Sequence, residues 1–300
     1  NTADLSLTGL ALRSLARRPK RSLGAVMLLA CGSFLIIAVA ANRLDARQQA
    51  NLPRSGTGGF AFLAESALPI FQNLDRPEGR AFLALDAAAL EGVHTVPMRV
   101  RDGDEASCLN LNRAQAPRLL GVRADALTNR FVFAEIAKGM SAPDPWLLLR
   151  EPLADGAVPA IADQASILWA MGKNVGDTLE IPGPRGQTVR LRFVAALSGS
   201  ILQGSVLISE EAFIRNFPDE SGYRAFLIDA PGNSKSAAPE LTRGLRDYGM
   251  ELVPTVSRLE ALNAVQNTYL STFQVLGGLG LLLGSVGMGV VLLRNVFERR

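Results

Sequence analysis

The sequence has few of the residues that most enzymes use for catalysis or metal binding. Its 300 residues include one histidine, His94, and two cysteines, Cys31 and Cys108. A single histidine excludes most histidine-based metal sites and makes a Ser-His-Asp triad depend on one loop residue. The two cysteines are not expected to pair, so an apolar core must stabilise the fold. We expect no enzymatic activity, no metal and no cofactor.

Phosphate-binding and nucleic-acid-binding patterns are also missing. The segment Gly172-Lys173-Asn174 lacks the upstream glycine and the following Ser or Thr of a phosphate-binding loop. Aromatic residues make up 6% of the chain, and they do not alternate with a basic stripe. The chain is therefore not expected to bind ATP in that way, and we expect no nucleic-acid partner.

Two long segments contain no charged residue. They run from Ser22 to Asn42 and from Ala261 to Leu293, which is 21 and 33 residues. Each is longer than the roughly 20 residues that cross a hydrocarbon core of about 30 Å. A charge at the middle of the bilayer costs about 2.5 to 3.5 kcal/mol, which explains why charges are absent. We predict transmembrane helices at residues 22–42 and within 257–293, with the bilayer as a partner.

The charges that are present divide between the ends and the middle of the chain. Residues 1–21 and 294–300 carry eight of the 31 basic residues and two of the 28 acidic ones. The middle keeps 23 basic and 26 acidic residues, a net charge of −3. Because basic residues beside a span mark the cytoplasmic side, both ends are predicted to be cytoplasmic. The prediction is a multi-pass protein of the bacterial inner membrane, with residues 43–269 periplasmic or extracellular.

The first apolar segment has an alternative interpretation as a cleaved signal peptide, because Ala38-Val39-Ala40 imitates a cleavage site. The segment is longer than the usual 7 to 15 apolar residues of a signal peptide. Residues 1–21 also have a helical pattern, with Leu7, Leu10 and Leu15 on one face, and Pro19 follows it. We expect an amphipathic helix in the cytoplasmic interface, in a chain cut from something longer.

The exported segment, residues 43–256, is predicted to be an α+β domain that begins with a helical stalk at Arg43–Ala50. Its patterns alternate between strands and helices, with an antiparallel hairpin at Gly183–Gly186. The predicted strands are residues 60–65, 158–162, 177–182, 188–196, 206–208, 223–229 and 250–253, and the predicted helices are 163–171, 209–217 and 236–248.

The last helix is predicted to run unbroken from Ser257 to Leu293, as a stalk that continues into the second span. Ser257 and Glu260 have the spacing of a capping box, in which each side chain satisfies the other's backbone N–H. Small residues follow inside the span, with Gly280 and Gly284 as one pair and Ser285 and Gly289 as another. Pairs with this spacing allow helices to approach closely, so we predict packing against further spans.

Three segments together carry a resemblance to a known family. They are residues 7–22 (LTGLALRSLARRPKRS), 171–181 (MGKNVGDTLEI) and 290–300 (VVLLRNVFERR). In this order they resemble the FtsX/MacB-type permease subunit of ABC transporters, also grouped as type VII. The resemblance implies a MacB-like periplasmic core between two spans, and two more spans after Arg300. It implies a cytoplasmic ABC ATPase subunit as partner, further spans or a second permease copy, and an ATPase contact starting at Asn295, Val296, Phe297, Glu298, Arg299 and Arg300.

Two other functions fit the same topology. A two-span receptor would carry an extracytoplasmic sensory domain and signal through the second helix to a cytoplasmic module. It would continue after Arg300 into a signalling domain, whereas a permease would continue into a short amphipathic helix and another apolar segment. An exported enzyme with a C-terminal anchor is opposed by the missing catalytic residues.

Overall fold

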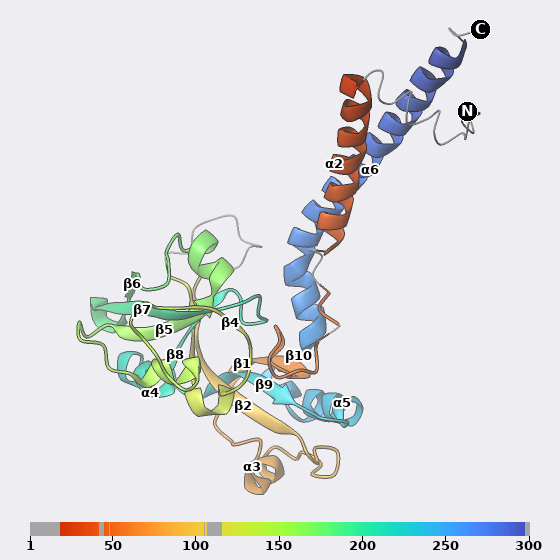
Figure 1. The fold of residues 1–300 in the computed structure, drawn as a ribbon. Helices are drawn as coiled ribbons and strands as arrows, with labels where there is room; N and C mark the ends of the chain where they lie inside the picture. The colour runs from red at the N-terminus through yellow and green to blue at the C-terminus, as the bar shows by residue number, and fades with distance from the viewer. Residues whose placement is uncertain (1–18, 42–44, 48, 105, 107–115, 298–300) are drawn as a thin grey trace. The chain divides into compact units, whose positions relative to one another are not determined.

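The computed structural model describes residues 19–41, 45–47, 49–104, 106 and 116–297. The chain divides into two units, of which one is residues 1–44 with 264–300 and the other is the folded domain, residues 45–263 (Figure 1). The predicted amphipathic helix at residues 1–21 lies outside the described residues up to position 18.

The described residues form helices α2 to α6 and strands β1 to β10. The α-helices are α2 (Pro19–Ala41), α3 (Pro77–Phe82), α4 (Glu210–Asn216), α5 (Ser234–Gly244) and α6 (Thr255–Phe297). The strands are β1 (Phe62–Ile70), β2 (His94–Arg101), β3 (Arg118–Val122), β4 (Phe133–Ile136), β5 (Val158–Asp163), β6 (Thr178–Pro182), β7 (Thr188–Leu197), β8 (Ser205–Ser209), β9 (Tyr223–Asp229) and β10 (Glu251–Pro254). The short helical turns are η1 (Ala124–Leu127), η2 (Pro145–Arg150), η3 (Ser166–Ala170), η4 (Pro184–Gly186) and η5 (Arg246–Tyr248).

The strands form one mixed sheet in the order β10-β1-β9-β2-β3-β8-β5-β7-β4, with β6 paired to β7. Among the strands of the described residues, the pairs β3–β8 and β5–β7 are parallel and the other pairs are antiparallel. Strand β2 joins the two halves of the sheet, because His94–Met98 pair with β9 and Arg99–Arg101 pair with β3. The prediction of a mixed α and β domain is confirmed, with a single sheet in which β2 belongs to both halves.

Three apolar clusters hold the sheet to its covering segments. The cluster beneath β1 and β9 includes Leu241 of α5, and the cluster beneath β5, β7 and β8 includes Phe213 of α4. The third, which we call the central core, contains Trp146, Ile201 and also Leu259 of α6. The first turns of α6 are thus part of the folded domain's own core.

Most of the predicted elements in the second half of the domain are confirmed. Strands β6 and β7 form the predicted hairpin, with Leu179 opposite Leu191. Helix α4 starts after Ser209, whose side chain accepts a hydrogen bond from the backbone N–H of Ala212. Helix α6 is unbroken from Thr255 to Phe297, as the apolar face of the sequence predicts.

Two local predictions are wrong. The described residues between Asp45 and Ala50 form bends and turns instead of a helix, because the Asp45 carboxylate accepts a hydrogen bond from the Arg47 backbone N–H at 2.9 Å. The capping box is also wrong, because α6 starts two residues before Ser257. The Glu260 carboxylate accepts a hydrogen bond from the Arg47 guanidinium at 2.6 Å. Glu260 therefore forms an ion pair with Arg47.

One described helix is long and apolar enough to cross a membrane. It is the Thr255–Val290 part of α6, and the apolar stretch of α2, Leu29–Ala41, is shorter. Helices α2 and α6 pack against each other where Gly32 faces Leu281, so closely that a Cβ atom on Gly32 would lie 2.8 Å from the Leu281 Cδ1 atom.

The two tryptophans provide a test of the central core. Trp146 is fully buried and its indole N–H donates to the Arg130 carbonyl at 3.0 Å, whereas Trp169 is 74% exposed. Trp146→Ala should lower the free energy of unfolding by about 3 to 5 kcal/mol, because it leaves a large cavity. Trp169→Ala should change it by less than about 0.5 kcal/mol. Thermal unfolding of the full chain measures both, and equal effects would contradict this assignment of the core.

Candidate functional site

The structure places the small residues of the second span along α6. A Cβ atom added to Gly280, Gly284 or Gly289 would meet no described atom within 4 Å. The Ser285 hydroxyl donates to the Leu281 carbonyl at 2.7 Å, one turn back in the same helix. Contact between α2 and α6 uses different glycines, Gly32 and Gly277. The predicted packing surface therefore takes no part in the α2–α6 contact among the described residues.

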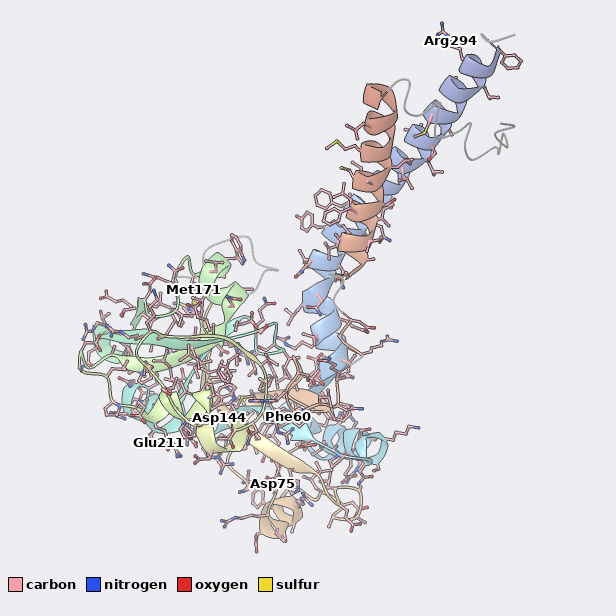
Figure 2. The ribbon with its side chains drawn as sticks, in the orientation of Figure 1. Phe60, Asp75, Asp144, Met171, Glu211 and Arg294 are labelled. Carbon is pink, nitrogen blue, oxygen red and sulfur yellow. The ribbon has the colours of Figure 1, made fainter. Side chains whose placement is uncertain are left out.

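The predicted ATPase contact starts in the last turn of α6. Asn295, Val296 and Phe297 belong to this helix, and the Phe297 side chain is 69% exposed. Glu298, Arg299 and Arg300 lie outside the described residues. Arg294, labelled in Figure 2, is the basic residue of the last turn of α6.

The root of α6, which we define as residues 255–262, is anchored in the folded domain. The side chains of Thr255, Leu259 and Leu262 are between 1% and 7% exposed. The Thr255 hydroxyl donates to the backbone carbonyl of Phe60, which is labelled in Figure 2 and lies just before β1. Polar and apolar contacts therefore both fix the helix where it leaves the sheet.

Gly56 lies between the root of α6 and the loop that connects β7 to β8. A Cβ atom at this position would be 2.4 Å from the Gly199 carbonyl oxygen and 2.9 Å from the Leu259 Cδ2 atom. Both distances are far below a normal van der Waals contact, and one of the two atoms belongs to the backbone. Only glycine allows the three segments to approach this closely.

The β7–β8 loop, residues 198–204, is buried over residues 200–204 and is hydrogen-bonded on two sides. The Ile201 N–H donates to the Gly56 carbonyl at 2.9 Å, and the Ile201 carbonyl accepts from the Arg258 Nε–H at 3.0 Å. On the other side, the Ser200 N–H donates to the Asp163 carboxylate at 2.7 Å. The loop thus joins the end of β5 to the root of α6.

Asp163 is a buried carboxylate, with 1% of its surface exposed. Its second oxygen accepts from the Ala165 N–H at 3.1 Å, the first free donor of the following helical turn. Burial raises the pKa of Asp163, and the hydrogen bonds from Ser200 and Ala165 offset part of that effect. The sequence predicts the helical turn after Asp163, and the structure adds the contact with Ser200.

A polar cleft of about 370 Å³ lies beside the root of α6. Glu65 and Glu251 are directly opposite each other on β1 and β10, and Arg118 pairs with Glu65 at 2.8 Å. The other wall includes Arg258 and residues 203–205 of the chain. In the described part of the chain, no three His, Cys, Asp or Glu side chains are placed to hold a metal ion.

Sequence reasoning missed the root of α6 as a site. Turn geometry accounts for Gly58 and Gly59, whose φ angles are +65° and +74°. Gly56 has no positive φ and is required by a contact with residues more than 140 positions away. No local pattern signals such a contact.

Gly56→Ala should loosen the root of α6 specifically. We expect a loss of stability of about 1 to 3 kcal/mol from overpacking and faster amide exchange in residues 256–262. Gly121→Ala is a matched control, because its Cβ atom would lie 2.7 Å from the Phe213 Cβ atom, away from α6. Hydrogen exchange of the full chain should show faster exchange at the root in the first variant only.

The raised pKa of the buried Asp163 carboxyl predicts that the stability of the folded domain depends on pH. A carboxyl whose folded-state pKa is raised contributes stability below its unfolded pKa of about 3.9 and loses it as pH rises through the folded value. Relative to wild type, Asp163→Asn should therefore gain in unfolding temperature as pH rises from about 4 toward neutrality. Gly56→Ala adds no titratable group, so its difference from wild type should stay constant. If the difference in unfolding temperature between Asp163→Asn and wild type also stayed constant with pH, the prediction would be contradicted.

The chain was compared with known proteins. No family model matches it, and no curated protein matches it by sequence. Among solved structures, the periplasmic region of MacB from Actinobacillus actinomycetemcomitans is similar, at 8% sequence identity and a TM-score of 0.34. The match covers 73% of this chain and 98% of that one.

Proposed function

We propose that the chain is a permease subunit of an ABC transporter. It has no catalysis of its own and couples ATP hydrolysis by a partner ATPase to movement of its extracytoplasmic domain, for export or mechanotransmission. The observation that carries this proposal is α6. One continuous helix supplies buried residues of the folded domain and an apolar stretch long enough to cross a membrane.

The length and anchoring of α6 suit it to transmit movement. A helix of 43 residues is about 64 Å long, roughly twice the thickness of the hydrocarbon core. Because Leu259 lies in the central core, a shift of the helix displaces packed side chains instead of solvent. Close-packed interiors have low compressibility and pass such strain on.

The sequence resemblance supports the same function. The segment at residues 171–181 matches the family's hairpin entry, and its two glycines, Gly172 and Gly176, have φ angles of +64° and +98°. Both positions favour glycine because other residues rarely adopt these angles. The segment leads into β6 and the β6–β7 hairpin, where the family pattern expects it.

The membrane part of the proposal has two spans in this chain, α2 and α6, with both ends of the chain in the cytoplasm. The open glycines on α6 offer a surface to further permease spans or to a second permease copy. Asn295 to Arg300 would then start the contact with the ATPase, beside the basic Arg294. The folded domain would lie outside the cytoplasm of a bacterial cell, as the charge distribution predicts.

A two-span receptor is the second candidate, because α6 would also carry a signal from a sensory domain. The glycine-rich span favours the permease, since a bundle of several helices uses more close-packing surfaces than a pair. The two candidates differ in their partners, which an experiment can identify.

Purification of the full protein from its native membrane should bring an ABC ATPase with it. Phe297→Ala should weaken that association roughly tenfold, as the loss of an exposed aromatic anchor does at protein interfaces. Leu279→Ala, a substitution at an exposed residue in the middle of α6, is the control and should leave the association unchanged. A preparation with no ATPase, and with no change in conformation on adding ATP, would contradict the permease and favour the receptor.

A further inference from the structure

The β7–β8 loop is more buried than a connecting loop usually is. Its residues Ser200, Ile201 and Leu202 are between 0% and 3% exposed. Loops normally run over the surface, because buried backbone N–H and C=O groups need partners. In this loop the partners come from two different parts of the domain, and each part contributes specific residues.

On one side the loop is bonded to the segment formed by the end of β5 and by η3. Asp163 accepts from the Ser200 N–H at 2.7 Å, and the Ser166 hydroxyl accepts from the Gly204 N–H at 3.0 Å. Ser166 is the first residue of η3, a single π-helical turn. Such turns are rare and frequently occur at functional sites. Met171, labelled in Figure 2, follows this turn.

On the other side the loop is bonded to the root of α6. Ile201 accepts from the Arg258 Nε–H and donates to the Gly56 carbonyl, while the Gly199 carbonyl leaves no room for a side chain at Gly56. Asp163 and Arg258 therefore bind adjacent residues, Ser200 and Ile201. A displacement at either residue changes the hydrogen-bond geometry at the other.

Glycines stand near both ends of the loop. Gly199 and Gly204 have φ angles of +56° and +96°, which glycine adopts without strain.

We propose that the β7–β8 loop is a latch that couples the root of α6 to η3, with Asp163 and Arg258 as its positioning residues. The inference rests on the proposed function, in which α6 carries movement into the folded domain. The movement then passes through Arg258, Ile201, Ser200 and Asp163 to η3. This turn presents Leu168 and Trp169 to solvent, at 43% and 74% exposure, so the latch ends on an exposed apolar surface.

The test perturbs one end of the latch and measures the other, in the full chain in lipid nanodiscs without ATPase or ATP. Arg258→Ala removes the bond to the Ile201 carbonyl. It should raise amide exchange at Ser200 and across η3 by about tenfold, the effect expected when roughly 1.4 kcal/mol of local protection is lost. In the reverse direction, Asp163→Asn should raise exchange in residues 256–262, because coupling between two sites is reciprocal.

Two controls separate the latch from general loosening. Arg224→Ala removes another hydrogen-bonded arginine, which contacts Asp102 and the Val100 carbonyl, and should leave both η3 and the root of α6 unchanged. Arg258→Lys keeps an N–H donor at this position and should retain most of the protection of the η3 amides against exchange. Amides of α5 serve as an internal reference, since its buried residues Ala237 and Leu241 lie in the cluster beneath β1 and β9, which contains neither Ile201 nor Leu259.

Unchanged exchange in η3 for Arg258→Ala would overturn the proposal, and so would an equal rise in η3 and α5. Failure to find an ATPase partner would contradict the permease but not the latch, because the exchange experiment contains no ATPase. A coupled response of η3 and α6 in this experiment supports the latch whichever partner the chain has.

Discussion

The anchoring of α6 in the central core is the constraint on which the rest of the structure depends. A helix that leaves a sheet and continues into an apolar span transmits movement only if its root is fixed. Here Leu259 is buried among the core residues, Thr255 bonds to Phe60, and Arg258 bonds to the β7–β8 loop. Gly56 has no side chain because any side chain would separate these segments.

Close packing of aromatic side chains contributes to the central core of the folded domain. Phe131 and Phe133 both meet the Trp146 ring in edge contacts, with centroids 6.0 and 5.4 Å apart. Strand β2 pairs with both halves of the sheet, which connects the part that contains β10 and the root of α6 to the part that contains η3. One sheet therefore connects the two apolar clusters and the central core of the domain.

Helices α2 and α6 of the other unit meet in a close contact at a glycine, with Gly32 opposite Leu281. Close approach of this kind is also how helices associate in lipid, which is as apolar as leucine.

The sequence by itself determined the elements with strong local signals. Charge-free segments and periodic apolar residues predicted an unbroken helix over residues 257–293, which lies within α6. Ser209 predicted the start of α4, and a turn flanked by alternating residues predicted the β6–β7 hairpin. Strand β2 was not predicted, because Pro97 at its centre weakens the strand pattern, yet β9 pairs with it. Only the tertiary structure decided that Glu260 bonds to Arg47 and that Asp163 bonds to Ser200. These contacts join residues 213 and 37 positions apart, and local propensity holds no information on partners so distant.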